Sequence, residues 1–166
     1  MNGGKSDVLI GVGSNISPFQ NIEKALTLLR EQTTLLKISP FYRSKPHGFS
    51  DQDDFINGCI VLTWEASPEE LKFNILKKIE ERTGRVRTEN KNGARTIDLD
   101  ILLFGELVLK KKDITIPDPE TFKRNYILYP AKQIAGDMVN PHSGKRLQEY
   151  DTTMAGLTPV SLPLLS

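Results

Sequence analysis

The sequence predicts an α+β fold in which an antiparallel sheet carries two helices. Segments with a period of two, which is typical of strands, alternate along the chain with segments that have a helical apolar stripe. Their order over residues 7–104 is strand, helix, strand, strand, helix, strand. Two strand–helix–strand halves of this kind form the ferredoxin-like split βαβ sandwich, with both helices on one face of the sheet.

The first half begins with a buried strand over residues 7–12 (DVLIGV). A turn at residues 13–15 (GSN) follows it. Ser17 to Gln20 has the pattern of a capping box with proline at the first helical position, so a helix is expected to begin there. Its apolar stripe continues until about Gln32.

The middle of the chain predicts two strands separated by a long loop. Residues 34–42 form a strand that is broken or left on an edge at Pro40, which cannot donate a ladder hydrogen bond. Residues 43–54 carry proline, glycine and serine and are expected to be a loop, and loops of this length are often functional. Residues 55–64 (FINGCIVLTW) alternate as the next strand, with Cys59 and Val61 on the face opposite to Ile60.

The second half repeats the pattern. Ser67 to Glu70 is another capping box, and its helix is expected to stop at Gly84. Residues 97–103 alternate as a strand. Residues 126–135 are helical, with a break near Pro130, and could cover the open face of the sheet. The tail, residues 151–166, is expected to wrap the domain or to be loosely ordered.

Charged residues around the last of these strands give the strongest functional signal. Asp98 and Asp100 are two residues apart, so both carboxylates point to one face, and four of the chain's eight arginines fall within residues 82–95. Paired carboxylates suit Mg²⁺, which usually takes one or two of them together with substrate phosphates, and arginines suit phosphate oxygens. The pattern therefore favours a metal–nucleotide site. The alternative is an arginine-rich hairpin that neutralises two surface aspartates.

A second candidate site lies at the start of the strand over residues 55–64. Phe55 and Asn57 fall on the same face, next to the long loop. An aromatic ring beside a carboxamide, which both donates and accepts hydrogen bonds, suits a flat heterocycle. The alternative is a core phenylalanine beside a turn asparagine.

Composition is that of an ordinary globular protein. A chain of 166 residues fits one domain over 1–166, with residues 1–6 as a flexible N-terminus. A net charge of +1 gives no long-range attraction to nucleic acid or membranes. One cysteine forms no intrachain disulfide, and no apolar run approaches the ~20 residues that cross a bilayer. We therefore expect a monomeric, cytoplasmic protein with no nucleic-acid or membrane partner.

These residues resemble a known family, the 6-hydroxymethyl-7,8-dihydropterin pyrophosphokinases, over residues 8–135. The most specific match in residue type and spacing comprises residues 84–87 (GRVR) and 91–100 (KNGARTIDLD). Shorter blocks, such as residues 13–15 and 55–57, follow in family order. The resemblance implies the ferredoxin-like sandwich and the transfer of diphosphate from ATP to a pterin alcohol in folate biosynthesis, with release of AMP.

The resemblance also implies roles for single residues. Asp98 and Asp100 would ligate two Mg²⁺ ions, and Arg85 and Arg95 would bind the transferred diphosphate. The remaining nucleotide-site residues would be Lys77, Glu80, Arg87, Ile101, Thr115, Asp118 and Arg124. The pterin would lie between Phe55 and Tyr126, and its edge would be read by Asn57 and by the segment that contains Ser44, Lys45 and His47. No general base is obvious, because an aspartate bound to Mg²⁺ is a poor proton acceptor.

Five positions depart from the family pattern, among them Ala94, where a proline is frequent, and Lys45 in the pterin loop. Asp118 stands where the family usually has histidine, Lys77 where it has glutamine, and Asn92 where an aromatic residue is frequent. A carboxylate near ATP repels phosphate unless it faces the ribose, an amine or a metal. A second hypothesis is therefore an impaired or substrate-shifted relative that binds pterin or nucleotide as a module. A third is an RNA-binding sandwich, but the strands lack the basic and aromatic face that such proteins use.

Overall fold

The computed structural model describes residues 4–45, 53–84 and 96–162, and it confirms the α+β sandwich. The strands are β1 (Ser6–Ser14), β2 (Thr34–Ile38), β3 (Phe41–Ser44), β4 (Phe55–Trp64), β5 (Asp98–Phe104), β6 (Leu109–Lys111), β7 (Ile114–Ile116) and β8 (Thr158–Val160). The helices are α1 (Pro18–Gln32), α2 (Pro68–Glu70), a π-helix (Leu71–Leu76), α3 (Lys77–Arg82) and α4 (Asn125–Ala135), with 3₁₀ turns at Pro119–Phe122 and Leu147–Glu149.

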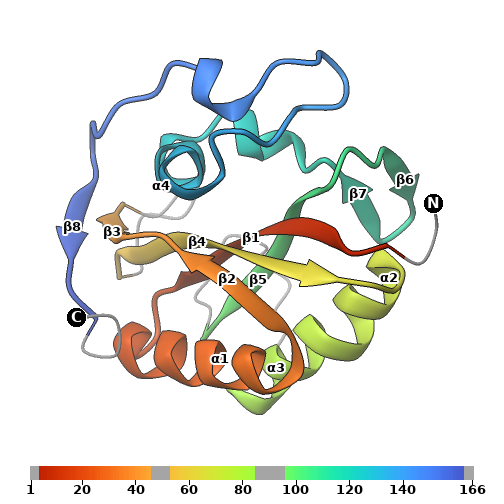
Figure 1. Cartoon of the computed structure of the whole chain (residues 1–166). Coiled ribbons are helices and arrows are strands. Elements are labelled where there is room, and N and C mark those ends of the chain that lie inside the picture. Colours follow the sequence, from red (N-terminus) through yellow and green to blue (C-terminus); the bar gives the residue numbers. More distant parts are fainter. Residues whose placement is uncertain (1–3, 46–52, 85–95, 163–166) are drawn as a thin grey trace.

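Six strands form one antiparallel sheet (Figure 1). Their order is β5-β1-β4-β3-β8, and β2 pairs with β4 as well. The register of β1 with β4 runs without interruption from Ser6 opposite Trp64 to Ser14 opposite Ile56. β6 and β7 form a separate hairpin. The central position of β1 and β4 follows from their length and their nearly continuous apolar sequence.

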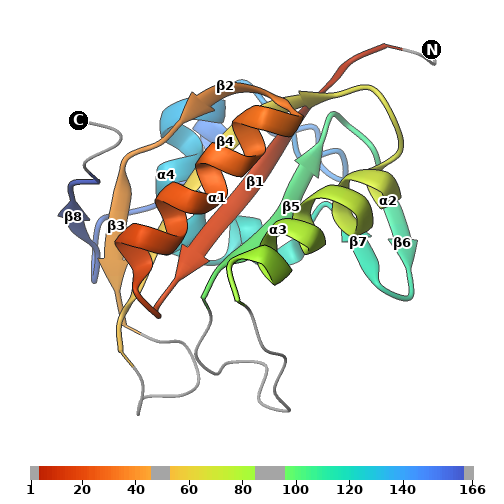
Figure 2. The ribbon, with the colours of Figure 1, turned by 90° about the horizontal axis from the view of Figure 1, so that it is seen from below.

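Apolar side chains leave the sheet on both faces, as the alternation predicts. Val8 and Ile10 of β1 belong to a buried cluster with residues of α1 and α3, whereas Leu9 belongs to a second cluster with Cys59 and residues of α4. Figures 1 and 2 show α1 and α3 on one side of the sheet and α4 on the other. The helix over residues 125–135 therefore covers the face that the split βαβ sandwich leaves open. In the described part of the chain, no helix is both long and apolar enough to span a membrane.

The helix that begins after Ser67 changes its winding part-way along. Ser67 Oγ accepts a hydrogen bond from the N–H of Glu70 at 3.1 Å, which confirms this cap. The π-helical turns then separate the buried residues Leu71 and Leu76 by five positions instead of the usual three or four. As a result, Ile79 and Glu80 of α3 are both buried.

One local prediction was wrong. Ser17 has a positive φ of 41° and its side chain forms no capping hydrogen bond, so the first capping box was wrong. Part of the tail is ordered, because residues 158–160 form β8 and pair with residues 41–43 of β3. Of the two alternatives for the tail, this segment follows the wrapping one.

Gly58 of β4 lies under the ring of Phe41, and an added Cβ would lie 2.7 Å from Phe41 Cδ2. Phe41 is 1% exposed, so its ring has little space to move. We expect Gly58→Ala to lower the free energy of unfolding by about 1–3 kcal/mol, measured by urea denaturation. Gly4→Ala, whose Cβ would meet nothing within 4 Å, is the control and should leave the midpoint unchanged. Equal stability of the two variants would contradict the close packing at Gly58.

Candidate functional site

A row of residues crosses four neighbouring strands at one end of the sheet. Gly13 of β1 lies opposite Asp98 of β5 on one side and opposite Asn57 of β4 on the other. Asn57 in turn lies opposite Tyr42 of β3. Residues directly opposite each other in antiparallel strands project to the same face. Asp98 and Asn57 therefore share a face of the sheet, two strand spacings or about 10 Å apart.

Gly13 leaves space above β1 for the side chain of Asn57. A Cβ added to Gly13 would lie 2.6 Å from Asn57 Oδ1, so the carboxamide of Asn57 occupies the space that a side chain would need. Asn57 Nδ2 also donates to Ser44 Oγ at 3.2 Å, and Ser44 lies opposite Phe55. The structure thus brings together three of the residues predicted for the heterocycle: Ser44, Phe55 and Asn57.

The face of this row is the one that α4 covers. The hydroxyl of Tyr42 donates to Gln133 Oε1 of α4 at 2.8 Å. Tyr126, in the first turn of α4, is half-buried. Burial raises the pKa of Tyr126, Arg124 lowers it, and three carboxylates raise it further: those of Glu120, Asp118 and Asp100. The Tyr126 phenol is therefore within electrostatic range of Asp100, one of the two predicted metal ligands on β5.

β5 carries both predicted metal ligands. Asp98 is half-buried and Asp100 is exposed, and the buried Leu99 between them points to the opposite face. Within the described residues, no cluster of three or more His, Cys, Asp or Glu side chains could hold a metal ion. A pair of carboxylates nevertheless fits Mg²⁺, because this ion commonly takes one or two protein carboxylates and completes its shell with phosphates and water.

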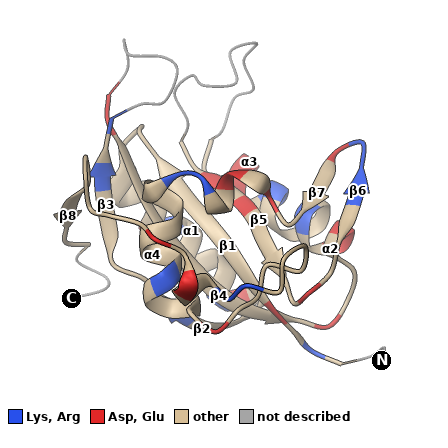
Figure 3. Ribbon diagram, turned by 90° about the horizontal axis from the view of Figure 1, so that it is seen from above, with Lys and Arg blue, Asp and Glu red and all other residues tan. Residues whose placement is uncertain are grey.

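Glu80 contacts the same strand from α3. Its side chain is 8% exposed, and Oε2 accepts a hydrogen bond from the backbone N–H of Leu99 at 2.9 Å. Figure 3 shows acidic positions of α3 and β5 at the same end of the sheet. Glu80, which the resemblance assigns to the nucleotide site, is thus buried between the helix and the strand.

A cleft of about 290 Å³ lies beside β5 and collects four of the predicted nucleotide residues: Asp100, Ile101, Thr115 and Asp118. Leu99 and Ile114 supply apolar walls, and Lys72 is an additional cationic residue on its lining. Lys77 does not line this cleft, and its Nζ lies 5.8 Å from the centroid of the Phe73 ring. The sequence analysis did not single out Lys72, which lies at the start of the π-helix.

Asp118 has a backbone partner. Its Oδ1 accepts from the N–H of Glu120 at 2.9 Å and caps the 3₁₀ turn Pro119–Phe122. Burial raises the pKa of Asp118, and the hydrogen bond from Glu120 lowers it by less. Nearby, Arg124 Nε forms an ion pair with Glu120 Oε1 at 2.6 Å. The capping bond gives the unexpected carboxylate a structural role at the edge of the cleft.

A family model matches residues 9–136 of this chain. Its description is 7,8-dihydro-6-hydroxymethylpterin-pyrophosphokinase (HPPK). The chain belongs to this family. A 2-amino-4-hydroxy-6-hydroxymethyldihydropteridine pyrophosphokinase of Synechocystis is 39% identical over 142 residues, which cover 84% of this chain and 71% of the relative. The protein with the same name from Haemophilus influenzae is 38% identical over 137 residues, covering 81% and 84%.

Solved structures with HPPK domains have the same fold. The wild-type HPPK-DHPS protein of Plasmodium falciparum matches with a TM-score of 0.69 at 12% sequence identity. The match covers 87% of this chain and 44% of that chain. The chain thus spans less than half the length of that protein, and at this identity the likeness establishes the fold.

Four residues predicted for the HPPK site lie outside the described residues: His47, Arg85, Arg87 and Arg95. Asn92, one of the departures from the family pattern, does so as well. Lys45 is described and exposed, directly after β3. The roles of these residues stay predictions.

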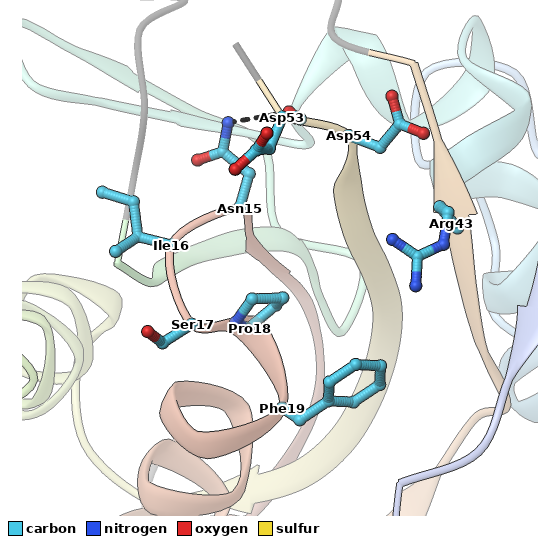
Figure 4. Close-up of a pocket in the computed structure, with 8 residues that line it drawn as sticks. All are labelled: Asn15, Ile16, Ser17, Pro18, Phe19, Arg43, Asp53 and Asp54. Carbon is cyan, nitrogen blue, oxygen red and sulfur yellow. Dashed lines mark hydrogen bonds between the residues drawn. The ribbon is translucent and has the colours of Figure 1, made fainter.

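A wider cleft of about 620 Å³ lies at the start of α1 (Figure 4). Pro18 and Phe19 line one side and Arg43 the other, and Asn15 Nδ2 donates to the carbonyl oxygen of Asp53 at 3.1 Å. Arg43 follows Tyr42 in β3, so it projects to the face opposite to the row at Asn57. The described lining of this wider cleft includes none of the residues predicted for the HPPK site.

The raised pKa of Asp118 predicts a pH-dependent effect on stability. Because the pKa of Asp118 is raised in the folded state, the contribution of this side chain to the free energy of unfolding is greatest below its ordinary pKa of 3.8. This contribution is lost as the pH rises through the folded-state pKa. Asp118→Asn keeps an oxygen acceptor without the charge, so thermal unfolding should show a higher Tm than wild type at pH 7 and a smaller difference near pH 4. Asp118→Ala, which removes the cap, should lose about 1 kcal/mol. An Asn variant as unstable as the Ala variant at pH 7 would show that the charge itself is needed.

Proposed function

We propose that this chain is a single-domain, monomeric cytoplasmic enzyme of folate biosynthesis. It transfers the diphosphate of ATP to the hydroxymethyl group of 6-hydroxymethyl-7,8-dihydropterin and releases AMP. Family membership supports this reaction, since relatives at 36–39% identity carry the pyrophosphokinase name. The structural observation that supports it best is the row in which Asn57 and Asp98 flank Gly13 on one face.

The pterin binds on the Asn57 side of the row. Its ring lies between Phe55 and Tyr126, which are both half-buried on or above this face. The carboxamide of Asn57, already oriented by its bond to Ser44 Oγ, supplies a donor and an acceptor for the edge of the heterocycle. Ser44, Lys45 and His47 contribute through the segment that follows β3.

ATP binds on the Asp98 side of the row. The cleft between β5 and β7 receives the nucleoside end, with Leu99 and Ile114 against the base and Thr115 within reach of the ribose. Asp98 and Asp100 hold two Mg²⁺ ions, which when bound neutralise negative charge on the phosphate oxygens. Arg85 and Arg95 bind the transferred group, and Lys77, Arg87 and Arg124 complete the nucleotide site. Glu80 belongs to this site through its contact with the N–H of Leu99 and not through contact with ATP.

In this arrangement the protein mainly positions the two substrates. The hydroxyl oxygen of the pterin bonds to the β-phosphorus, the bond from that phosphorus to the bridging oxygen of the AMP group breaks, and the hydroxyl proton is lost to solvent. Such phosphoryl transfers depend on alignment and charge neutralisation instead of a covalent intermediate. A spacing of about 10 Å between Asp98 and Asn57 leaves room for the reacting groups between them.

A second candidate function is a relative that binds pterin or nucleotide with little turnover. Asp118 favours it, because this carboxylate lines the nucleotide cleft. Isothermal titration with a non-hydrolysable ATP analogue, Mg²⁺ and the pterin, run beside a turnover assay, separates the two functions. Tight ternary binding without AMP release would support the binding module.

The proposed reaction predicts AMP release from ATP and Mg²⁺ only when the hydroxymethyl pterin is present. Asp98→Ala and Asp100→Ala should each lower turnover by at least about 100-fold, because the charge on the phosphates is no longer neutralised in place. Circular dichroism should show an unchanged fold. Asp137→Ala, at a side chain that is 91% exposed, is the control and should keep the wild-type rate. Wild-type turnover in Asp98→Ala or Asp100→Ala would contradict the assignment of that residue as a Mg²⁺ ligand.

A further inference from the structure

Glu80 is a buried carboxylate close to the end of a helix, where the helix dipole disfavours a negative charge. Burying such a group costs free energy unless hydrogen bonds compensate for lost hydration. The N–H of Leu99 supplies one such bond to Oε2 at 2.9 Å. A hydrogen bond to a charged acceptor is stronger than a neutral one. Because Leu99 lies between Asp98 and Asp100, the carboxylate contacts the backbone at the centre of the predicted metal site.

β5 needs contacts of this kind at its outer edge. It is an end strand of the six-stranded sheet, and β1 is its neighbour in that sheet. End strands present N–H and C=O groups that no ladder satisfies. Glu80 accepts from Leu99, and the N–H of Asp118 donates to the carbonyl oxygen of Leu102 at 3.0 Å. The two contacts lie on either side of Asp100 along the strand.

The segment that carries Glu80 is itself fixed. The π-helix brings Glu80 to the buried side of α3, next to Ile79. Thr83 Oγ1 donates to the carbonyl oxygen of Glu80 at 2.8 Å, and Lys24 Nζ of α1 donates to that of Arg82 at 2.8 Å. Localised π-helical turns are frequent at functional sites. The helix end therefore acts as a rigid support against which β5 is held.

We propose that Glu80 is a positioning residue: through the N–H of Leu99 it fixes the backbone of β5, and so sets where Asp98 and Asp100 present their carboxylates to Mg²⁺ and the ATP phosphates. This inference rests on the proposed function of the site. It assigns Glu80 a role through the strand, in which the length of the side chain and its acceptor oxygen matter more than its negative charge.

Two substitutions separate positioning from direct electrostatics. Glu80→Gln keeps the side-chain length and an oxygen acceptor but removes the charge. Glu80→Asp keeps the charge but shortens the side chain by one methylene, which withdraws the acceptor from Leu99. Positioning predicts that Gln preserves function better than Asp. Direct binding of a cation by the Glu80 charge predicts the reverse order.

The first measurement is AMP formation at varied Mg²⁺ concentration. Loss of a group that orients metal ligands typically costs 10- to 100-fold in metal affinity or activity. We expect Glu80→Asp to raise the Mg²⁺ concentration for half-maximal rate, or to lower kcat, by about 10-fold or more, with the KM for the pterin unchanged. Glu80→Gln should stay close to wild type. Glu81→Ala, at an exposed neighbour on α3, is the matched control.

The second measurement needs no catalysis. In the ligand-free chain, NMR should show that the Leu99 amide exchanges with solvent slowly in wild type and in Glu80→Gln, and faster in Glu80→Asp. The Val61 amide, in the middle of β4, is the internal reference for global stability. Slow exchange at Leu99 in all three proteins, or Gln impaired as much as Asp in the rate assay, would overturn the proposal.

These assays distinguish an error in the proposed function from an error in the role proposed for Glu80. If wild type releases no AMP with ATP, Mg²⁺ and the pterin, the reaction is wrong whatever the variants do. If wild type is active and Glu80→Asp matches it in rate and Mg²⁺ requirement, the reaction stands and the role of Glu80 is wrong.

Discussion

The antiparallel register of β1 with its two neighbours is the constraint on which the site depends. It places Gly13 between Asp98 and Asn57 and thereby joins the two halves of the site across a single strand. A slip of one residue would turn the β5 aspartates toward the cluster under α1 and α3, where ionised carboxylates would be buried among apolar side chains. The apolar alternation of β1, with Val8 and Ile10 on one face and Leu9 on the other, prevents such a slip. Core packing and site geometry are therefore determined by the same pattern.

The glycines of β1 determine which side chains cover this part of the sheet. Side chains at positions 11 and 13 of β1 would project to the α4 face, opposite Asp100 and Asp98. With glycine there, neighbouring strands supply the covering groups instead: Leu102 leans over Gly11, and the Asn57 carboxamide leans over Gly13. The side chain that covers β1 is thus apolar at Gly11 and polar at Gly13.

Strand periodicity in the sequence was enough to predict the sheet, the shared face of Asp98 and Asp100, and the pairing of Phe55 with Asn57 on one face. Helix phase was not predictable in the same way. A uniform α-helical repeat gives no reason to insert π-helical turns at residues 71–76, so the burial of Glu80 was missed. β8 was missed for another reason, since its pairing with β3 joins segments more than 100 residues apart and local patterns carry no information about it. Asp118 caps a 3₁₀ turn. Comparing the residue at this position with the family pattern does not predict that turn.

Charge explains why β5 needs support that is independent of its functional face. Two ionised carboxylates about 7 Å apart repel each other by about 2–3 kcal/mol at an effective dielectric constant of about 20. An end strand with such a face gains ladder hydrogen bonds from one side only. Contacts at its other edge, from Glu80 to the N–H of Leu99 and from the N–H of Asp118 to Leu102, use backbone groups and leave the aspartate side chains available. Because β5 is held in place before the ligands bind, less of their binding free energy is lost in ordering the strand.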